Sequence, residues 1–364
     1  MHTRTGVLLS VITLLLFTYP LAQVYAQASD VILEGKIENI RTIEKEFVGQ
    51  VLPVLVLDTR ILTDPMKGVV VKIDQPPSQK DTVFRIGDRV LVSASSVEGR
   101  DPVYYIVDVV RTDSLRILLF IFMILVLVVA GWQGVRSLLG LSISFFVLMT
   151  VVMPKLFAGQ DPVMTAVFGA FIIAPLTFYF THGLNRKTTI ALAGTAVSLL
   201  VTAVFSHLFI TLGKLTGYAS EEVQFLQIAK GGTLNPQGLL LAGIIIGTLG
   251  ILDDVTISQA SVVSELKKAN KKLRRSELFI RAMRVGRDHI AATVNTLVLV
   301  YTGASLPLLL LFLNSSQPFA YLVNYEIVAE EITRSLVGSI GLILAVPITT
   351  ALSVFVNQKT KSGI

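Results

Sequence analysis

The sequence contains no cysteine and few charged residues. None of its 364 positions is a cysteine, which excludes disulfides, thiolate metal sites and thiol nucleophiles. Only 15% of the residues are Asp, Glu, Lys or Arg, whereas soluble domains carry about 25%. Together with a mean hydropathy of +0.70, this composition excludes disorder and most soluble enzymes. We therefore expect an integral membrane protein.

Motifs for common enzyme chemistry are also missing. No GxxxxGK[ST] stretch supplies the phosphate-binding loop of ATPases, and no GxSxG stretch supplies a nucleophile elbow. The histidines are scattered and show no HExxH or similar zinc-ligand spacing; they are His2, His182, His207 and His289. We therefore expect a protein that is not an enzyme and that uses no metal and no cofactor.

Residues 1–26 have the pattern of a secretory signal peptide. Arg4 precedes an apolar stretch from Gly6 to Tyr19, and Val24-Tyr25-Ala26 suits the small-residue rule for cleavage. We expect cleavage after Ala26. The alternative is a signal sequence that is retained as an additional helix.

Residues 27–113 are expected to form a small exported β-rich domain. Five β-branched runs between turn residues match a barrel of the oligonucleotide/oligosaccharide-binding (OB) type in strand count. The 13 acids and 11 bases of residues 27–111 argue against nucleic acid as a partner, whereas an exported protein partner is compatible with this balance. The five runs are Val31–Ile40, Val51–Leu57, Gly68–Ile73, Val83–Ala94 and Val103–Val110.

Residues 114–357 are expected to form an all-α polytopic membrane domain. Long apolar segments separated by short polar loops are typical of helices that cross a bilayer. Seven such segments follow residue 114, at about 117–132, 137–157, 163–181, 189–213, 239–263, 290–313 and 335–356. The lipid bilayer is thus the first expected partner.

Charged residues predict the orientation of these spans. If the β-rich domain is exported, the alternate loops that face the cytoplasm hold 14 Lys and Arg residues, against five at the opposite ends of the spans. This bias follows the positive-inside rule and favours the cytoplasmic membrane of a bacterium, with a cytoplasmic C-terminus. Nine of the bases lie between Lys267 and Arg287. We therefore expect residues 264–289 to form a basic amphipathic helix on the cytoplasmic side.

The span 239–263 carries two adjacent acids, Asp253 and Asp254. If the helix ended before them, its apolar stretch would be too short to cross a bilayer, so at least one acid is expected inside the membrane. Helical spacing places small and polar residues on one face of this span. The small half is expected to pack closely against a neighbouring helix, and the polar half to face protein or water. This face comprises Gly243, Gly247, Gly250, Asp254, Ser258, Ser261 and Glu265.

Two interpretations of the acid pair remain. An ionised carboxylate is costly in a bilayer, so an acid there is expected to take up and release protons near neutral pH, as a proton relay does. Alternatively, Asp253 and Asp254 cap a cytoplasmic helix that follows them. We favour the relay, because the polar face continues through both acids.

Polar residues on other spans predict a shared polar interior. One stripe follows the fourth span and another the sixth, while the last span has a small-residue face. Glu326, Glu330 and Glu331 precede or enter the last span, where they either gate an entrance or lie in a solvated loop; Glu330 is grouped with the polar path. The stripes are Thr195, Ser198, Thr202 and Ser206; Asn295, Thr302 and Ser305; and Gly338, Gly341, Ala345 and Thr349.

The chain resembles the YibE/F family of bacterial multi-pass membrane proteins. The resemblance runs from about Val31 to Val356 and rests on two motifs, GTLGILDDVTISQA at 247–260 and EEITRSLVGSIGLILAVPIT at 330–349. The first motif is specific, because paired acids so placed are rare. The resemblance implies a membrane protein without implying a biochemical activity.

A weaker resemblance is to half of a resistance-nodulation-division exporter. The order of glycine-rich helix, Asp-Asp pair, charged connection and two further spans is similar, and this resemblance implies that Asp253 and Asp254 carry protons. The chain departs from that pattern in its two additional spans, its small exported domain and the absence of an intramembrane lysine. Arg334 is the nearest candidate for the missing cation.

The sequence thus predicts a proton-coupled transporter or exporter of a small solute whose identity the residues do not give. The alternative is a non-transporting scaffold or sensor whose exported domain binds a partner. A membrane-embedded enzyme is the third possibility, without a catalytic constellation to support it. A homo-oligomer is compatible with the glycine face, which could pack within one chain or between two.

Overall fold

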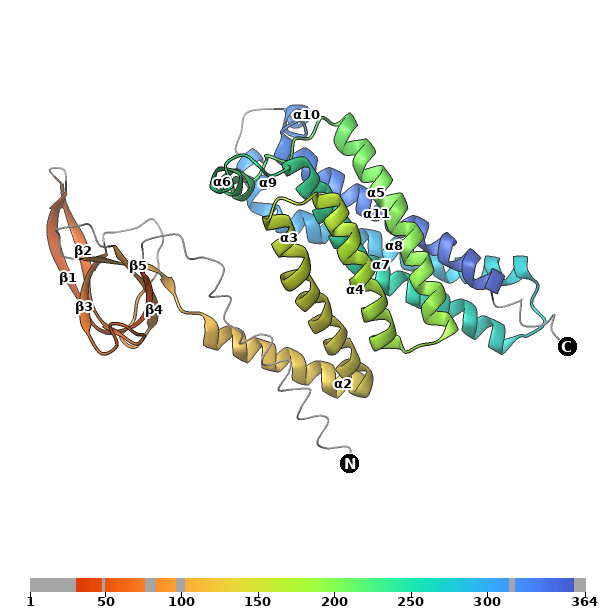
Figure 1. Cartoon of the computed structure of the whole chain (residues 1–364), viewed down its shortest axis with the longest axis horizontal. Coiled ribbons are helices and arrows are strands. Elements are labelled where there is room, and N and C mark those ends of the chain that lie inside the picture. Colours follow the sequence, from red (N-terminus) through yellow and green to blue (C-terminus); the bar gives the residue numbers. More distant parts are fainter. Residues whose placement is uncertain (1–30, 48–49, 76–82, 96–101, 314–317, 357–364) are drawn as a thin grey trace. The chain divides into compact units, whose positions relative to one another are not determined.

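The computed structural model describes residues 31–47, 50–75, 83–95, 102–313 and 318–356 (Figure 1). The expected signal peptide at 1–26 lies outside the described residues. The chain divides into two compact units, one ending at Val129 and the other beginning at Ala130. The first contains the β-strands and the second contains most of the helices.

The first unit is built on a five-stranded antiparallel sheet. Its strand order is β3-β2-β1-β4-β5, and the two edge strands, β3 and β5, contact each other. Alternating apolar residues face inward, as expected where one face of a sheet is buried. The strands are β1 Val31–Phe47, β2 Gln50–Ile61, β3 Val70–Gln75, β4 Arg89–Ser95 and β5 Val103–Val109. The core is Leu33, Ile37, Leu57, Ile61, Val71, Ile73, Val90 and Val92.

Helix α2 (Thr112–Val147) is interrupted at Gly131. Gly131 has φ 55° and ψ −134°, a conformation that glycine adopts readily because it lacks a Cβ. The first two predicted spans, 117–132 and 137–157, therefore fall on the two sides of this break. Beyond α2 the chain continues through the π-helical turn η1 (Leu148–Val152) and α3 (Met153–Phe157).

The remaining helices are α4 Pro162–His182, α5 Arg186–Leu212, α6 Glu221–Ala229, α7 Pro236–Ala269, α8 Arg275–Ala304, α9 Leu306–Leu313, α10 Phe319–Leu322 and α11 Glu326–Val356. Helices α4 and α5 follow the predicted spans 163–181 and 189–213 closely, and α7 and α11 extend beyond 239–263 and 335–356. The predicted span 290–313 is divided between α8 and α9, and α6 and α10 match no predicted span. Among the described residues, five helices are long and apolar enough to cross a membrane. These are Thr112–Phe157, Pro162–His182, Arg186–Leu212, Pro236–Ala269 and Glu326–Val356.

Capping residues fix where the long helices begin. Asp161 accepts a hydrogen bond from the Met164 amide (2.8 Å) before α4, and Asn235 accepts one from the Gly238 amide (3.0 Å) before α7. In both helices proline occupies the first turn, where its missing N–H costs no helical hydrogen bond. Pro162 lies beside Gly238, so α4 and α7 begin at the same end of the helical unit.

Helix α7 is at the centre of the helical unit. It packs against α4, α5, α8 and α11, and its buried residues contribute to four apolar clusters. Gly194 of α5 lies directly against Thr349 of α11, and Gly341 of α11 lies against Thr202 of α5. Small residues at these positions allow the helix backbones to approach closely.

The expected single amphipathic helix at 264–289 is wrong. Helix α7 continues to Ala269, a turn follows, and α8 begins at Arg275. The apolar residues of this segment pack into protein, since Leu273, Leu278 and Ala282 form a buried cluster with Val263. A hairpin buries these side chains between helices, which a helix lying on a bilayer does not do.

Candidate functional site

Asp253 and Asp254 lie in the middle of a continuous helix. The helix α7 runs from Pro236 to Ala269 without interruption. The helix that follows is capped by Arg274 and Glu277. The interpretation of the acid pair as the cap of a following helix is therefore wrong.

Asp253 faces the packed interior of the helical unit. It shares a face of α7 with Leu249 and Ile257, which belong to a buried apolar cluster with Phe178 of α4. Its Oδ1 atom is buried and has no hydrogen-bond partner among the described residues. A buried polar atom without a protein partner requires water, a proton or an ion. Asp253 is thus the unsatisfied acid of the pair.

Asp254 is exposed and points away from α7 in a different direction. It is close enough to His182, the last residue of α4, for their charges to interact. The two acids therefore point into different surroundings, as expected for adjacent residues that diverge by about 100° around a helix.

The small-residue face of α7 is not packed against another helix of the chain. A Cβ added at Gly243, Gly247 or Gly250 meets nothing within 4 Å among the described residues. Ser258 is exposed, and half-buried Ser261 donates to the backbone oxygen of Ile257 (2.7 Å). Of the two packings expected for this face, within one chain or between two, the described residues do not show the first, because α5 and α11 pack against the other side of α7.

The polar stripe of α5 does lie in the interior. Its four hydroxyl residues, Thr195, Ser198, Thr202 and Ser206, are all buried. They form one wall of a polar seam between α5, α7 and α11, whose other members are Thr248, Thr256, Gln259, Ser335, Ser339, Thr349 and Thr350. We call these eleven residues the hydroxyl seam.

Hydrogen bonds join the seam to the turn of α7 that carries Asp253. The hydroxyls of Thr195 and Thr256 are 2.8 Å apart, and the Thr256 hydroxyl also lies 3.3 Å from the backbone oxygen of Asp253. Elsewhere the hydroxyls donate to their own helix, as in the 2.9 Å bond from Thr202 to Ser198. Two seam hydroxyls, those of Ser206 and Thr349, have no partner among the described residues.

Gln259 is a seam residue that the sequence interpretation missed. Its amide nitrogen donates to the Thr350 hydroxyl (2.7 Å) and to the backbone oxygen of Ala282 (3.1 Å), so it links α7 to α8 and α11. The sequence does contain a signal for this role, because a glutamine within an apolar helix is expected to hydrogen-bond to another helix.

The stripe on α8 does not join the seam. Asn295 and Thr302 are exposed, and Ser305 is half-buried at the end of the helix. The expectation that these residues line the interior is wrong for Asn295 and Thr302. Helix α8 instead turns the side that contains Leu297 toward α7 and α11.

Glu330 marks the other end of the seam. Helix α11 begins at Glu326, so the three glutamates form its first turns. Glu326 accepts hydrogen bonds from the Thr216 amide, the Thr216 hydroxyl (2.7 Å) and the Gly217 amide (3.0 Å). Glu331 pairs with Arg334 at 2.7 Å. Glu330 is only 7% exposed, which excludes a solvated loop for this residue.

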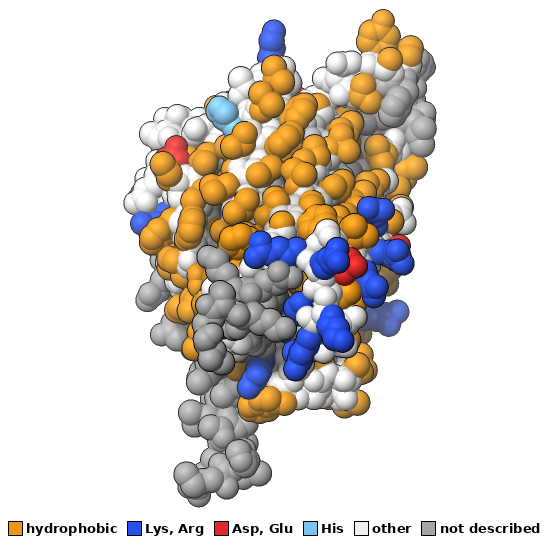
Figure 2. All heavy atoms as spheres, turned by 90° about the vertical axis from the view of Figure 1, so that its right-hand side faces the viewer, with side chains coloured by type: hydrophobic (Ala, Val, Ile, Leu, Met, Phe, Trp, Pro, Cys, Tyr) orange, Lys and Arg blue, Asp and Glu red, His pale blue; other side chains and the backbone are white. Residues whose placement is uncertain are grey.

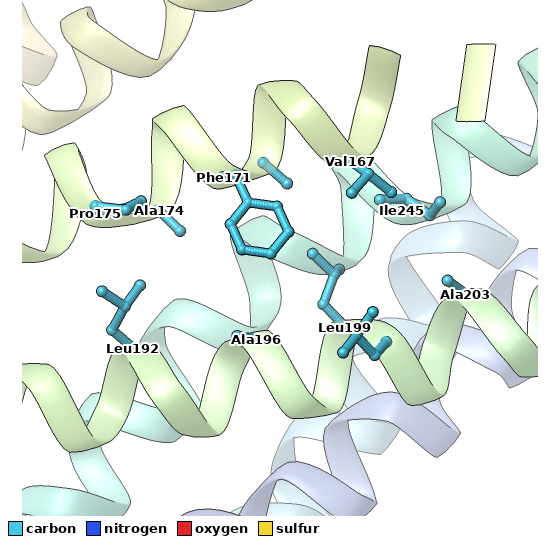
Figure 3. Close-up of a pocket in the computed structure, with 11 residues that line it drawn as sticks. Val167, Phe171, Ala174, Pro175, Leu192, Ala196, Leu199, Ala203 and Ile245 are labelled. Atoms are coloured by element: carbon cyan, nitrogen blue, oxygen red, sulfur yellow. The ribbon is translucent and has the colours of Figure 1, made fainter. Parts of the chain in front are cut away.

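A separate pocket between α4 and α5 is entirely apolar. Figure 3 shows Phe171 and Pro175 of α4 facing Leu192 and Leu199 of α5 across it. Its volume is about 120 Å³, and hydrocarbon is the only chemistry that its walls match. We assign it no part in moving charge.

Basic residues gather at one end of the helical unit. Figure 2 shows Lys and Arg side chains concentrated at this end. Lys187, at the start of α5, is close enough to Glu265 near the end of α7 to act on its charge. The turn between α4 and α5 and the turn between α7 and α8 therefore share this end. Within the described part of the chain, no group of three or more His, Asp or Glu residues is placed to hold a metal ion.

Comparison with known proteins gives one match. A family model described as "YibE/F-like protein" matches residues 118–359, which is more than half of the chain. The matched region contains the acid pair, the hydroxyl seam and Glu330, and it begins after the β-strands. None of the curated proteins or solved structures compared with the chain matches it significantly.

Proposed function

The chain belongs to the family of YibE/F-like proteins, and we propose that it is a proton-coupled transporter in which Asp253 relays protons. The observation that carries this proposal is the buried, unpartnered Asp253 Oδ1 atom beside the hydroxyl seam. Asp254, the other acid of the pair, is exposed on the outside of α7.

The energetics of burial favour a role in proton transfer. Removing a carboxylate from water costs several kcal/mol unless a partner compensates. No such partner reaches the Asp253 Oδ1 atom from the described residues, and leucine and isoleucine flank Asp253 on its face of α7. A protein that retains an acid in this setting gains a group that binds and releases a proton in response to its surroundings.

The hydroxyl seam supplies a path of suitable length. From Glu330 to Thr350 it follows α11 for 20 residues, which at about 1.5 Å per residue is about 30 Å, the thickness of a bilayer core. The seam hydroxyls of Ser198, Thr202, Ser339 and Thr350 donate to their own helix, so their remaining lone pairs are available to bound water. We propose that water held along these hydroxyls carries protons between Glu330 and Asp253.

The finer architecture belongs to the same proposal. We propose seven crossings, an exported OB-like barrel and a bacterial cytoplasmic membrane, with the basic end of the helical unit in the cytoplasm. The closure of β3 toward β5 and the strand order support the barrel. The clustering of basic residues at one end supports the orientation.

Because the chain has no cysteine, single introduced cysteines test the orientation cleanly. Lys271→Cys lies in the turn between α7 and α8, and Thr233→Cys lies at the opposite end before α7. In intact cells a membrane-impermeant maleimide should label Thr233→Cys alone, and Lys271→Cys only after permeabilisation. The reverse labelling would contradict the proposed orientation.

Proton movement tests the function itself. The full chain is reconstituted into vesicles that contain a pH-sensitive dye, and a potassium diffusion potential drives protons inward. We expect acidification above that of protein-free vesicles, loss of this signal in Asp253→Asn, and a reduced signal in Asp254→Asn. The control is Glu265→Gln on the same helix, whose carboxylate is exposed and paired with Lys268 at 2.8 Å.

Two outcomes would reject the proposal. Wild-type vesicles that acidify no faster than empty ones exclude the proton path, and an Asp253→Asn variant with full activity excludes Asp253 as the relay. If deletion of residues 27–111 abolishes the cellular function while both Asp→Asn variants retain it, the protein acts instead as a scaffold or sensor through its β-rich domain.

A further inference from the structure

A second hollow lies at the end of the helical unit where α11 begins. It is bounded by the loop before α6, the start of α7, the junction of α8 and α9, and the first turns of α11, with a volume of about 440 Å³. Figure 1 shows α6, α9 and α10 at this end, opposite the turn between α7 and α8. We call it the Glu330 cavity.

Three charged residues line this cavity, Glu330, Glu331 and Arg334, and Glu326 lies next to it in the sequence of α11. Glu326 accepts hydrogen bonds from the Thr216 amide and hydroxyl and from the Gly217 amide. Glu331 and Arg334 neutralise each other at 2.7 Å. Glu330 receives a hydrogen bond from the Ala219 amide, and its carboxyl group also hydrogen-bonds to that of Glu326, but its Oε1 atom has no partner among the described residues.

The Glu330 Oε1 atom therefore sets the polar specificity of the cavity. Glu330 is more than nine-tenths buried and lines the cavity wall. A buried carboxylate oxygen accepts hydrogen bonds and favours a positive charge. After the pairing of Glu331 with Arg334, the net charge at the wall is negative, so the complementary ligand carries an N–H donor and a positive charge.

The rest of the wall is largely hydrocarbon. Val223, Leu239, Leu308 and Ile327 contribute apolar surface to the same cavity. A small-molecule site usually combines such walls with a few polar groups that orient the ligand. The walls thus suit a compact apolar body attached to the positively charged group.

We propose that the Glu330 cavity binds a small organic cation, a protonated amine with a short apolar body, whose N–H group donates to Glu330 Oε1. The assignment rests on the proposed transport function in one respect, since it names the class of solute that the carrier moves. Binding itself requires neither Asp253 nor a proton gradient.

Binding is tested with 2-phenylethylammonium as the probe. Calorimetry at pH 7 on the full chain in lipid nanodiscs, corrected with empty nanodiscs, should show saturable binding of this amine. The isosteric alcohol 2-phenylethanol and the anion 3-phenylpropionate should bind at least about tenfold more weakly, because neither brings a positive charge to the Glu330 carboxylate.

Two variants assign the site to Glu330 and its cavity. Glu330→Gln should weaken amine binding about tenfold or more, since it keeps the shape and removes the charge. Ala304→Phe should weaken it by filling the apolar part of the cavity without altering Glu330. The matched control is Glu222→Gln, on the exposed side of α6 and outside the cavity lining; it should bind as wild type does.

Several outcomes would overturn the proposal. Alcohol binding as tight as amine binding, unchanged binding by Glu330→Gln and Ala304→Phe, or no saturable amine binding would each do so. Tighter binding of the anion would assign the cavity to Arg334 instead. If amine binds but wild-type vesicles show no proton movement, the cavity assignment stands and the proposed transport function fails; the converse result rejects the cavity assignment alone.

Discussion

Replacing Gly194 by alanine should destabilise the helical unit, because α5 and α11 meet at this residue. An added Cβ meets the Thr349 hydroxyl in a severe clash, lies 3.1 Å from the Thr349 Cβ atom and 3.4 Å from its Cα atom. Rotation of the Thr349 side chain relieves only the first of these contacts, so the two backbones must separate by a few tenths of an ångström. Overpacking of this kind costs about 1–3 kcal/mol.

Gly243→Ala provides the matched control. It makes the same change in the middle of a long helix, but at a position where an added Cβ meets nothing within 4 Å. Alanine is a better helix former than glycine by about 0.5–1 kcal/mol, so Gly243→Ala should be neutral or slightly stabilising in the same chain.

The assay is reversible unfolding of the full chain in mixed micelles with increasing SDS, followed by circular dichroism. Gly194→Ala should unfold at a lower SDS fraction than wild type, and Gly243→Ala at the same or a higher fraction. Adding Thr349→Ala to Gly194→Ala should recover part of the loss, because it removes the clashing hydroxyl. If Gly194→Ala unfolds together with Gly243→Ala, the close contact of α5 with α11 is refuted.

Three further predictions concern individual interactions. Thr195→Val keeps the side-chain volume but removes the 2.8 Å hydrogen bond to Thr256. It should lower the free energy of unfolding by about 0.6 kcal/mol in the same SDS assay, and zero coupling in a double-mutant cycle with Thr256→Val would contradict this. Glu326→Ala removes the acceptor for two backbone amides of the loop before α6, so hydrogen exchange there should accelerate about tenfold, whereas unchanged exchange would show that the loop is held by other contacts. The hydrogen bond and charge of Arg60 lower the pKa of Glu38 below its usual 4.5. Glu38 therefore stabilises the folded protein above pH 4.5, and this stabilisation is lost as the pH falls through the lower pKa of the folded state. Glu38→Gln should therefore speed hydrogen exchange in β1 relative to wild type at pH 7, and a difference of the same size at pH 2 would count against this pair.

Apolar runs and helix caps predicted much of the helical unit. The expected span 163–181 differs from α4 by one residue at each end. Asp161 and Pro162 give a clear start signal, because an Asp N-cap followed by proline in the first turn is typical of helix N-termini. The break at Gly131 was less accessible, since a glycine between apolar segments does not reveal whether the helix is interrupted or continuous. The long hairpin of α7 and α8 was missed for a related reason, because the basic residues 267–287 are compatible with either arrangement.

The candidate site shows the limit of helical periodicity. The stripe beginning at Thr195 and the stripe beginning at Gly243 have the same spacing, yet the first is buried and the second is open. Periodicity defines which residues share a face, whereas the partner of that face depends on how the other helices pack. Glu330 was hidden by a helix boundary, since α11 begins nine residues before the expected span at 335 and its first turns carry the glutamates into the protein.

The protonation state of Asp253 in lipid tests the central claim most directly. Infrared difference spectra of the full chain in nanodiscs, recorded across pH with Asp253→Asn and Asp254→Asn as references, report the protonated carboxyl through its C=O band. Our account predicts a band that disappears in Asp253→Asn, persists in Asp254→Asn and titrates close to neutral pH. A carboxyl at residue 253 that titrates near pH 4, as a solvated aspartate does, would contradict the account.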